Sequence, residues 1–231
     1  MKRLAIIPAR GGSKRIPNKN IKKFCGQPML SYAIQAACAA GIFDTIHVST
    51  DDQDIVHIAG SFGFSPEFMR PKALSGDHVS IMQCLKFVVE KFESLGKQFD
   101  TVAMLYATSP LIDPEDLKKA CVQFEANKRN RALLAVTPYP SPIEHAFRMD
   151  DNLDLLPDNY EALATRTQDL AEAFYDAGMF AIYSSSKIKE TVGAGSFFDF
   201  TGFKVPISRV TDIDWPEDWV HAENLKKALD L

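Results

Sequence analysis

The chain has 231 residues, of which 46% are hydrophobic, so one α/β domain with a sizeable core can form without disulfides or a structural metal. Its formal net charge is −4 and its pI is near 5.7, which disfavours a surface for nucleic acid or for an anionic membrane. The four cysteines show no C-x-x-C spacing, which is typical of a reduced cytoplasmic protein, and the first apolar run is too short for a signal peptide or a membrane span.

Apolar strands alternate with helical periodicity along the first part of the chain. The predicted strands are residues 4–7, 45–49, 101–106 and 132–137. The predicted helices are residues 29–40, a segment that ends at Phe62 after the cap Asp51–Asp52, residues 78–95, and a segment from Pro114 to about Asn127. This alternation predicts a mostly parallel, doubly wound sheet with helices on both faces.

The alternation breaks between residues 138 and 175, which hold four prolines and show weak periodicity. The segment is too long for an ordinary loop between a strand and a helix. It is therefore either a flexible flap or an excursion that packs on a second subunit. Beyond it we predict a strand at 177–183, a short helix at 184–190, a turn-rich loop at 193–202 and a terminal helix at 216–231, all within a single domain of residues 1–231.

A basic, glycine-containing loop follows the first strand. Gly11 and Gly12 are adjacent, and the cations of the loop are Arg10, Lys14, Arg15, Lys19 and Lys22. The spacing matches neither a Walker A loop nor a dinucleotide fingerprint. Backbone N–H groups near such glycines form a concavity for anions, and the ends of parallel strands are where ligands bind. The loop therefore predicts a polyphosphate site, whereas the alternative is a solvated basic turn after an edge strand.

Two polar segments elsewhere are candidates for the same site. Asp212 and Asp214 flank Ile213 in an apparently extended stretch, so both carboxylates can face one cation. Such a pair suits Mg²⁺, although Asp214 with Pro216 and Glu217 also resembles a helix N-cap. Arg70 and then Ser75, Asp77 and Ser80 form a polar run before a helix, where Ser75 or Asp77 could be a cap.

Residues 9–20, ARGGSKRIPNKN, resemble the signature loop of the CMP-sugar-acid synthetases. Later segments resemble the pseudaminic acid enzymes of that family in particular: residues 68–71, 105–110, 166–170, 174–178 and 212–214. The similarity extends from Leu4 to about Trp219, nearly the whole chain. It implies a nucleotide-diphospho-sugar transferase-like fold, and it implies that residues 138–175 are a dimerisation excursion.

The resemblance also implies roles for single residues. For the nucleotide they are Arg10, Gly11, Gly12, Ser13, Lys14, Lys19, Asn20, Arg70, Asp77 and Ser80; for Mg²⁺ they are Asp212 and Asp214; for the sugar they are Tyr106, Thr108, Ser109, Arg166 and Gln168. Arg10, Lys14, Lys19 and Asp214 form the expected catalytic set, in which Asp214 or a metal-bound hydroxide could be the base. Arg166 is the expected partner of the sugar carboxylate, because a guanidinium forms a fork that matches a carboxylate.

Three positions depart from the sialic acid enzymes. Arg15 stands where a glycine is common, Tyr106 where a glutamine is usual, and Ile112 where an arginine is usual. The last two predict a more apolar end of the sugar pocket, which favours pseudaminic acid.

The expected reaction joins CTP to a nine-carbon 2-keto sugar acid and releases pyrophosphate. The alternatives are the same reaction on legionaminic, sialic or 3-deoxy-octulosonic acid, a sugar-1-phosphate nucleotidyltransferase, and an inactive nucleotide-binding module. We expect a cytoplasmic homodimer.

Overall fold

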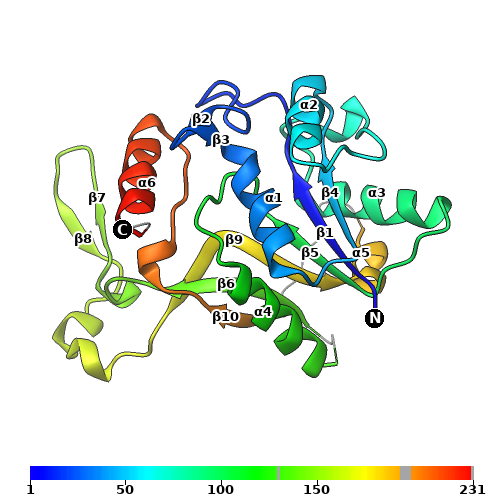
Figure 1. The fold of residues 1–231 in the computed structure, drawn as a ribbon. Coiled ribbons are helices and arrows are strands. Elements are labelled where there is room, and N and C mark those ends of the chain that lie inside the picture. Colours follow the sequence, from blue (N-terminus) through cyan, green and yellow to red (C-terminus); the bar gives the residue numbers. More distant parts are fainter. Residues whose placement is uncertain (129–130, 193–198, 230–231) are drawn as a thin grey trace.

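The computed structural model describes residues 1–128, 131–192 and 199–229. Its centre is a six-stranded sheet in the order β10-β6-β9-β5-β1-β4 (Figure 1). The strands are β1 (Arg3–Pro8), β4 (Thr45–Ser49), β5 (Thr101–Leu105), β6 (Ala132–Pro138), β9 (Phe174–Ser184) and β10 (Phe200–Lys204). β9 runs antiparallel to both of its neighbours, β5 and β6, and the other pairings are parallel. The predicted mostly parallel sheet is confirmed.

The strands alternate their side chains between two helical layers. Ala5 and Ile7 of β1 pack in one core cluster with α1 (Met29–Ala40), α2 (Gln53–Ser61) and α4 (Pro114–Ala126). Leu4 and Ile6 of the same strand pack in a second cluster with α3 (Ile81–Ser94) and α5 (Ser185–Glu190). Because β1 is covered on both faces, it is apolar at successive positions, as a central parallel strand should be.

Two boundaries differ from the prediction. α3 begins at Ile81 and not at residue 78, because Ser80 is its N-cap: Ser80 Oγ accepts from Gln83 N at 3.3 Å, and Gln83 Oε1 accepts from Ser80 N at 2.9 Å. This reciprocal pair is a capping box, so Ser75 and Asp77 are not the caps. β10 begins within the predicted turn-rich loop of residues 193–202 and continues past its end to Lys204, and residues 193–198 of that loop are outside the described residues.

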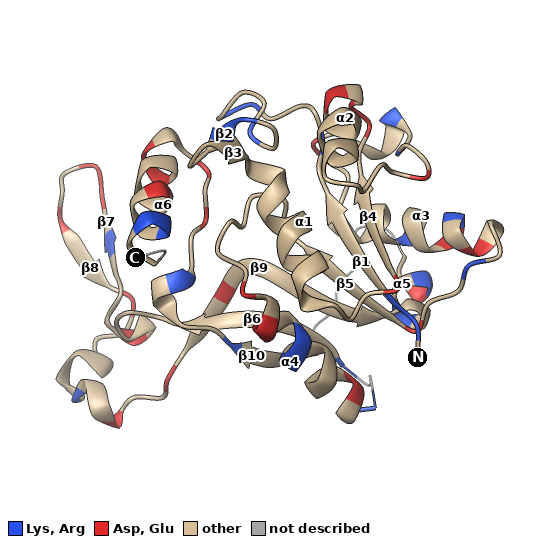
Figure 2. Cartoon of the chain, in the orientation of Figure 1, with Lys and Arg blue, Asp and Glu red and all other residues tan. Residues whose placement is uncertain are grey.

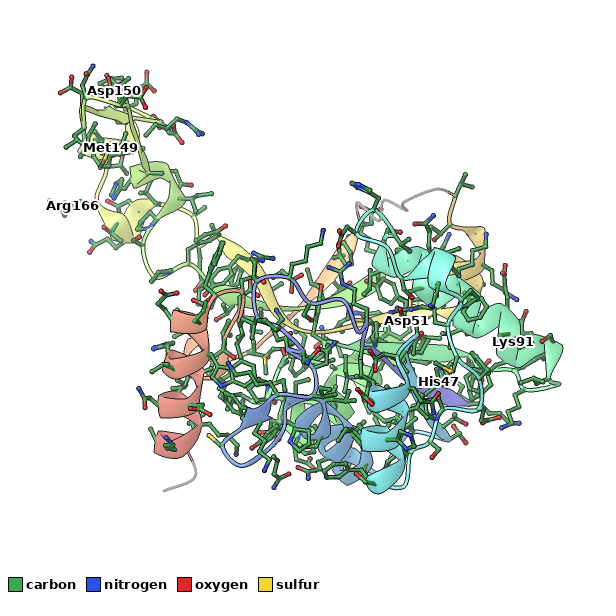
Figure 3. The ribbon with its side chains drawn as sticks, turned by 90° about the horizontal axis from the view of Figure 1, so that it is seen from above. His47, Asp51, Lys91, Met149, Asp150 and Arg166 are labelled. Carbon is green, nitrogen blue, oxygen red and sulfur yellow. The ribbon has the colours of Figure 1, made fainter. Side chains whose placement is uncertain are left out.

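The irregular segment between β6 and β9 forms an arm that extends away from the sheet (Figures 1 and 3). It carries a small antiparallel hairpin of β7 (Phe147–Met149) and β8 (Leu155–Pro157), which the prediction missed. Large apolar side chains are exposed along this arm: Tyr139, Ile143, Phe147, Met149, Leu153, Leu155, Leu156, Tyr160 and Leu163. An exposed apolar surface of this kind typically marks an interaction site.

A third apolar cluster joins the two ends of the chain. The short strands β2 (Lys23–Phe24) and β3 (Gln27–Pro28) pair after the basic loop. Ile16 and Phe24 pack against Ile213, which precedes α6 (Pro216–Leu229), and against Trp219 within that helix. Ile213 is only 1% exposed, so it fixes the segment before α6 beside the basic loop. Basic residues of the loop and acidic residues before α6 thereby lie on the same side of the molecule (Figure 2). Among the described residues, no helix combines the length and apolar composition needed to cross a bilayer.

Candidate active site

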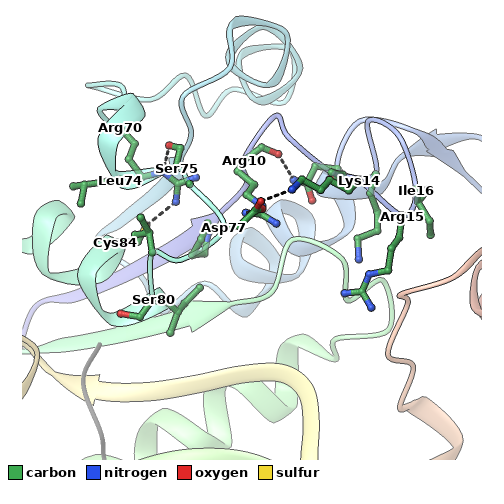
Figure 4. Close-up of a pocket in the computed structure, with 17 residues that line it drawn as sticks. Arg10, Lys14, Arg15, Ile16, Arg70, Leu74, Ser75, Asp77, Ser80 and Cys84 are labelled. Carbon is green, nitrogen blue, oxygen red and sulfur yellow. Dashed lines mark hydrogen bonds and ion pairs between the residues drawn. The ribbon is translucent and has the colours of Figure 1, made fainter. Parts of the chain in front are cut away.

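A cavity of about 570 Å³ lies between the basic loop after β1 and the segment that leads into α3 (Figure 4). Eight of the predicted nucleotide residues line it: Arg10, Ser13, Lys14, Lys19, Asn20, Arg70, Asp77 and Ser80. Segments some sixty residues apart in the sequence thus meet in one hollow at the carboxyl end of β1. This location is where open α/β sheets bind their ligands.

Asp77 occupies the cations of the basic loop. Its two carboxylate oxygens lie 2.9 Å from Arg10 Nη1 and 2.5 Å from Lys14 Nζ (Figure 4). The hydrogen bond and the charge of Lys14, with a smaller effect of Arg10, lower the pKa of Asp77 below its usual range. Asp77, which was predicted to contact the nucleotide, is therefore an internal counterion of Arg10 and Lys14, the two cations expected to bind phosphate.

The backbone of the basic loop is held by side chains around it. Gly11 is required there, because a Cβ at this position would overlap the Asp52 carboxylate. Gly11 N donates to Asp51 Oδ1 at 3.4 Å, and Ser13 N donates to Gly11 O at 3.0 Å. Two of the amides predicted to bind phosphate are thus already used within the protein. A Cβ on Gly12, by contrast, would meet open space.

Two further residues shape the loop from behind. Asn20 is 7% exposed, and its Nδ2 donates to Arg10 O at 2.9 Å. Lys19 Nζ donates to Ile213 O at 2.5 Å and lies 3.5 Å from Asp214 Oδ1. Lys19 therefore connects the basic loop to the acidic segment before α6.

Asp214 faces the basic loop and not the helix that follows it. Its Oδ2 lies 2.8 Å from Arg15 Nη1, and Arg15 also stacks 5.4 Å from the ring centroid of Trp215. The carboxylate at the start of α6 belongs to Asp218, whose Oδ2 accepts from Asp214 N at 2.9 Å and from Trp215 N at 2.7 Å. Asp218 lies in the first turn of α6 and binds the N–H groups just before the helix, whereas the Asp214 carboxylate is held by Arg15 and Lys19, so the alternative of Asp214 as an N-cap finds no support.

Asp212 lies beside two other acidic residues. Burial, followed by the charge of Asp214, raises the pKa of Asp212. Burial, partly offset by the N–H of Gly178, raises the pKa of Asp176, and Asp212 adds to that shift. Burial and the same two carboxylates, Asp176 and Asp212, raise the pKa of Tyr106 to about 12. These three side chains form a polar group at the carboxyl end of β5.

Asp212 and Asp214 offer two carboxylates, which suits Mg²⁺ better than it suits a metal that takes all of its ligands from the protein. Ile213 is buried between them, so the two carboxylates flank a fixed point beside the cavity. The structure describes no group of three or more acidic, histidine or cysteine side chains that could hold a metal, within residues 1–128, 131–192 and 199–229. Mg²⁺ ordinarily takes one or two carboxylates and completes its shell with water and substrate phosphates.

Arg70 forms the far wall of the cavity, where it is 7% exposed. Its Nε donates to Ser75 Oγ at 3.1 Å, and its Nη1 donates to Cys84 Sγ at 2.9 Å (Figure 4). Arginine is rarely buried to this degree, so a merely structural role on the surface of a loop does not account for Arg70. Figure 4 shows Arg70 on the other side of the cavity from Lys14 and Arg15, and its role toward the nucleotide stays a prediction.

The residues predicted for the sugar are less well assembled. Ser109 is 3% exposed and its Oγ donates to Gly178 O, so it ties β5 to β9. Ile112 is 7% exposed in the core cluster that includes α4, and it does not line the described cavity, so its place at the sugar pocket stays a prediction. Tyr106 and Thr108 are half-buried at the end of β5, and neither lines the described cavity.

Arg166 and Gln168 lie on the arm. Arg166 precedes a 3₁₀ turn at Thr167–Asp169, and Figure 3 shows it far from the body of the sheet. The candidate for the sugar carboxylate is therefore distant from the cavity of its own chain.

Three residues with a place in the site were not predicted. Arg15 was left out of the catalytic set yet pairs with Asp214. Asp176 was part of a recognised segment but received no role. Cys84 gave no signal in the sequence, because its place in the site depends on a contact with Arg70, which belongs to a different segment of the chain.

Comparison with known proteins is consistent with this geometry. Residues 4–228 match a family model described as cytidylyltransferase. The chain is 38% identical to the pseudaminic acid cytidylyltransferase of Campylobacter jejuni, with 98% of this chain and 97% of that protein aligned. It is 29% identical to the CMP-N,N'-diacetyllegionaminic acid synthase of Legionella pneumophila, over 97% of this chain and 96% of that one.

A solved CMP:2-keto-3-deoxy-manno-octonic acid synthetase in complex with CTP superposes with a TM-score of 0.74. The match covers 100% of both chains at 20% sequence identity, so it shows a shared fold.

Proposed function

The chain belongs to the cytidylyltransferase family, and from this premise we propose that it joins CTP to a nine-carbon 2-keto sugar acid, with pseudaminic acid favoured, and yields a CMP-sugar and pyrophosphate. The observation that carries the proposal is the cavity, where cations at one end and a buried arginine at the other match a nucleoside triphosphate. The C. jejuni relative, aligned over 98% of this chain, favours pseudaminic acid over the other acids.

In this proposal the triphosphate takes the place that Asp77 occupies. Arg10 and Lys14 would then neutralise phosphate oxygens in place of a carboxylate. Nucleotidyl transfer develops charge on the α-phosphate and on the departing pyrophosphate, and fixed cations at these points lower the barrier. Gly12, with open space beside it, allows the backbone to approach the ligand closely.

The acidic segment before α6 would hold Mg²⁺. Asp212 and Asp214 are the proposed ligands, and Lys19 and Arg15 keep the Asp214 carboxylate in place. When bound, Mg²⁺ would supply charge neutralisation at the phosphates and a template for the incoming hydroxyl. The anomeric hydroxyl of the sugar acid attacks the α-phosphorus and gives its proton to a base, for which Asp214 is a candidate. The bond from the α-phosphorus to the oxygen that bridges it to the β-phosphate breaks, pyrophosphate leaves, and no covalent enzyme intermediate is needed.

We propose further that the protein is a homodimer built on one domain per chain, with the arm as its dimerisation excursion. The exposed apolar side chains of the arm support this, because a second copy would cover them. A second copy would also bring Arg166 and Gln168 to a pocket that their own chain cannot offer them (Figure 3). None of the four cysteines, all of which lie in the described part of the chain, forms a disulfide, which supports a cytoplasmic location.

A substrate panel tests the proposal. With CTP and Mg²⁺, we expect pyrophosphate release with pseudaminic acid and poor release with legionaminic, sialic and 3-deoxy-octulosonic acids. Turnover of a sugar 1-phosphate, or tight CTP binding without turnover of any acid, would overturn it. Comparable kcat/KM values for pseudaminic and sialic acid would limit the claim to sugar acids as a class.

A further inference from the structure

A buried thiol lies in the wall of the nucleotide cavity. Cys84 on α3 is 2% exposed, and its Sγ accepts a hydrogen bond from Arg70 Nη1 at 2.9 Å. The same Sγ lies 3.3 Å from Ser49 Oγ at the end of β4. The thiol therefore connects the sheet, α3 and the arginine of the cavity.

The partners of Arg70 fix the plane of its guanidinium group. Nε donates to Ser75, Nη1 donates to Cys84, and Nη2 lies 3.8 Å from Asp51 Oδ1. The backbone is fixed as well, because Arg70 N donates to Thr50 O at 2.7 Å. Each of the three nitrogens faces a different part of the protein, and because the guanidinium is planar, the contact with Cys84 helps to fix the orientation of the whole group.

A guanidinium held in this way can discriminate between pyrimidines. It has only N–H donors and no acceptor. Cytosine offers two adjacent acceptors, O2 and N3, whereas N3 of uracil carries a hydrogen and would face the arginine donor to donor. A mismatch of this kind leaves buried polar groups unpaired, which is the strongest source of discrimination between similar ligands.

We infer that Cys84 is a positioning residue for nucleotide choice: by holding Arg70 Nη1, it orients the guanidinium toward the acceptor edge of cytosine. The inference rests on the proposed use of CTP. Cys84 itself touches the arginine and need not touch the base. The contact to Sγ is short at 2.9 Å, so a serine hydroxyl, whose bond to Cβ is shorter, can still lie within hydrogen-bond range of Nη1, whereas an alanine offers no acceptor.

The experiment measures binding of CTP and of UTP by calorimetry, with the full-length protein and without sugar acid. The variants are Cys84→Ala and Cys84→Ser. Cys121→Ala is the matched control, because Cys121 is equally buried on another helix, α4, and does not line the cavity. The unfolding midpoint is recorded for all of them.

We expect Cys84→Ala to bind CTP about tenfold more weakly and to lose a similar factor of its preference for CTP over UTP. Cys84→Ser should restore most of both, and Cys121→Ala should change neither, even where its unfolding midpoint falls. Unchanged CTP affinity and CTP/UTP ratio in Cys84→Ala, or a serine variant as defective as the alanine variant, would overturn the inference. A wild-type protein that does not bind CTP would overturn the proposed function itself, and the two failures are thus distinguishable.

Discussion

Arg166 and Asp212 make a mixed dimer the sharpest test of the proposed assembly. Arg166 lies on the arm, away from the cavity of its own chain, whereas Asp212 lies beside that cavity. In a dimer where each arm completes the partner's site, a chain with Arg166→Ala keeps Asp212 for its own site. A chain with Asp212→Ala keeps Arg166 and can supply it to the site of the partner.

The expected activity follows from counting sites. In a heterodimer of these two variants, one site combines the intact Asp212 with the partner's intact Arg166, and the other site carries both defects. The heterodimer should therefore show about half of the wild-type kcat per dimer. If Arg166 instead acted within its own chain, each site would carry one defect. Arg166→Ala alone should lower kcat/KM for the sugar acid roughly 10- to 150-fold, because a charged hydrogen bond is lost.

The assay needs the two chains co-expressed with different affinity tags and purified over both in succession. Pyrophosphate release is then compared with that of each homodimeric variant and of doubly tagged wild type, after circular dichroism has shown that all are folded. Failure to recover any protein after the second column would refute the dimer. Recovery of a heterodimer no more active than its parents would refute the shared site.

Three further predictions concern single positions. Ser80→Ala should lower the unfolding midpoint by about 2–4 °C, as loss of an N-cap does, and leave CTP affinity nearly unchanged. The control is Ser184→Ala, which removes the N-cap of α5. A large loss of CTP affinity in Ser80→Ala alone would instead make Ser80 a ligand of the nucleotide. Asp212→Asn should abolish the response of the rate to added Mg²⁺ without lowering thermal stability, since it removes a charge that Asp214 repels; wild-type rates across a Mg²⁺ titration would end the metal assignment. Burial lowers the pKa of His47 to about 4, so the unfolded state binds the extra proton between that value and about 6.5, and stability should fall by up to about 3 kcal/mol as the pH drops through this window. His47→Leu should flatten that part of the curve in urea titrations, and an unchanged slope would show that His47 is not responsible.

Local patterns predicted the helices and most strands correctly because local chemistry decides them. The alternation of β1 between two apolar clusters and the Gly41 cap of α1 are visible in the sequence. β10 was missed because Gly202 lies in its middle and its side chains are mostly exposed. What makes this segment a strand is its pairing with β6, opposite Leu134, and a single-strand pattern cannot report that pairing.

The candidate site likewise has a part that the sequence predicts and a part that depends on packing. The basic loop is contiguous, so its cations and glycines could be found as a motif. The contact of Asp77 with Arg10 and Lys14, and that of Cys84 with Arg70, depend on how α3 is placed against β1.

Asp77 has a consequence for which anions can enter the site. A carboxylate attached to the chain competes at a high effective concentration for the two cations it rests on. A free monoanion such as acetate or chloride offers no more charge than this tethered competitor, so we expect it to displace the Asp77 carboxylate poorly. A triphosphate brings several charges at once and can engage both cations in place of the Asp77 carboxylate. The basic loop would then select among the anions of a cell by their charge density, before the protein makes any contact with the base.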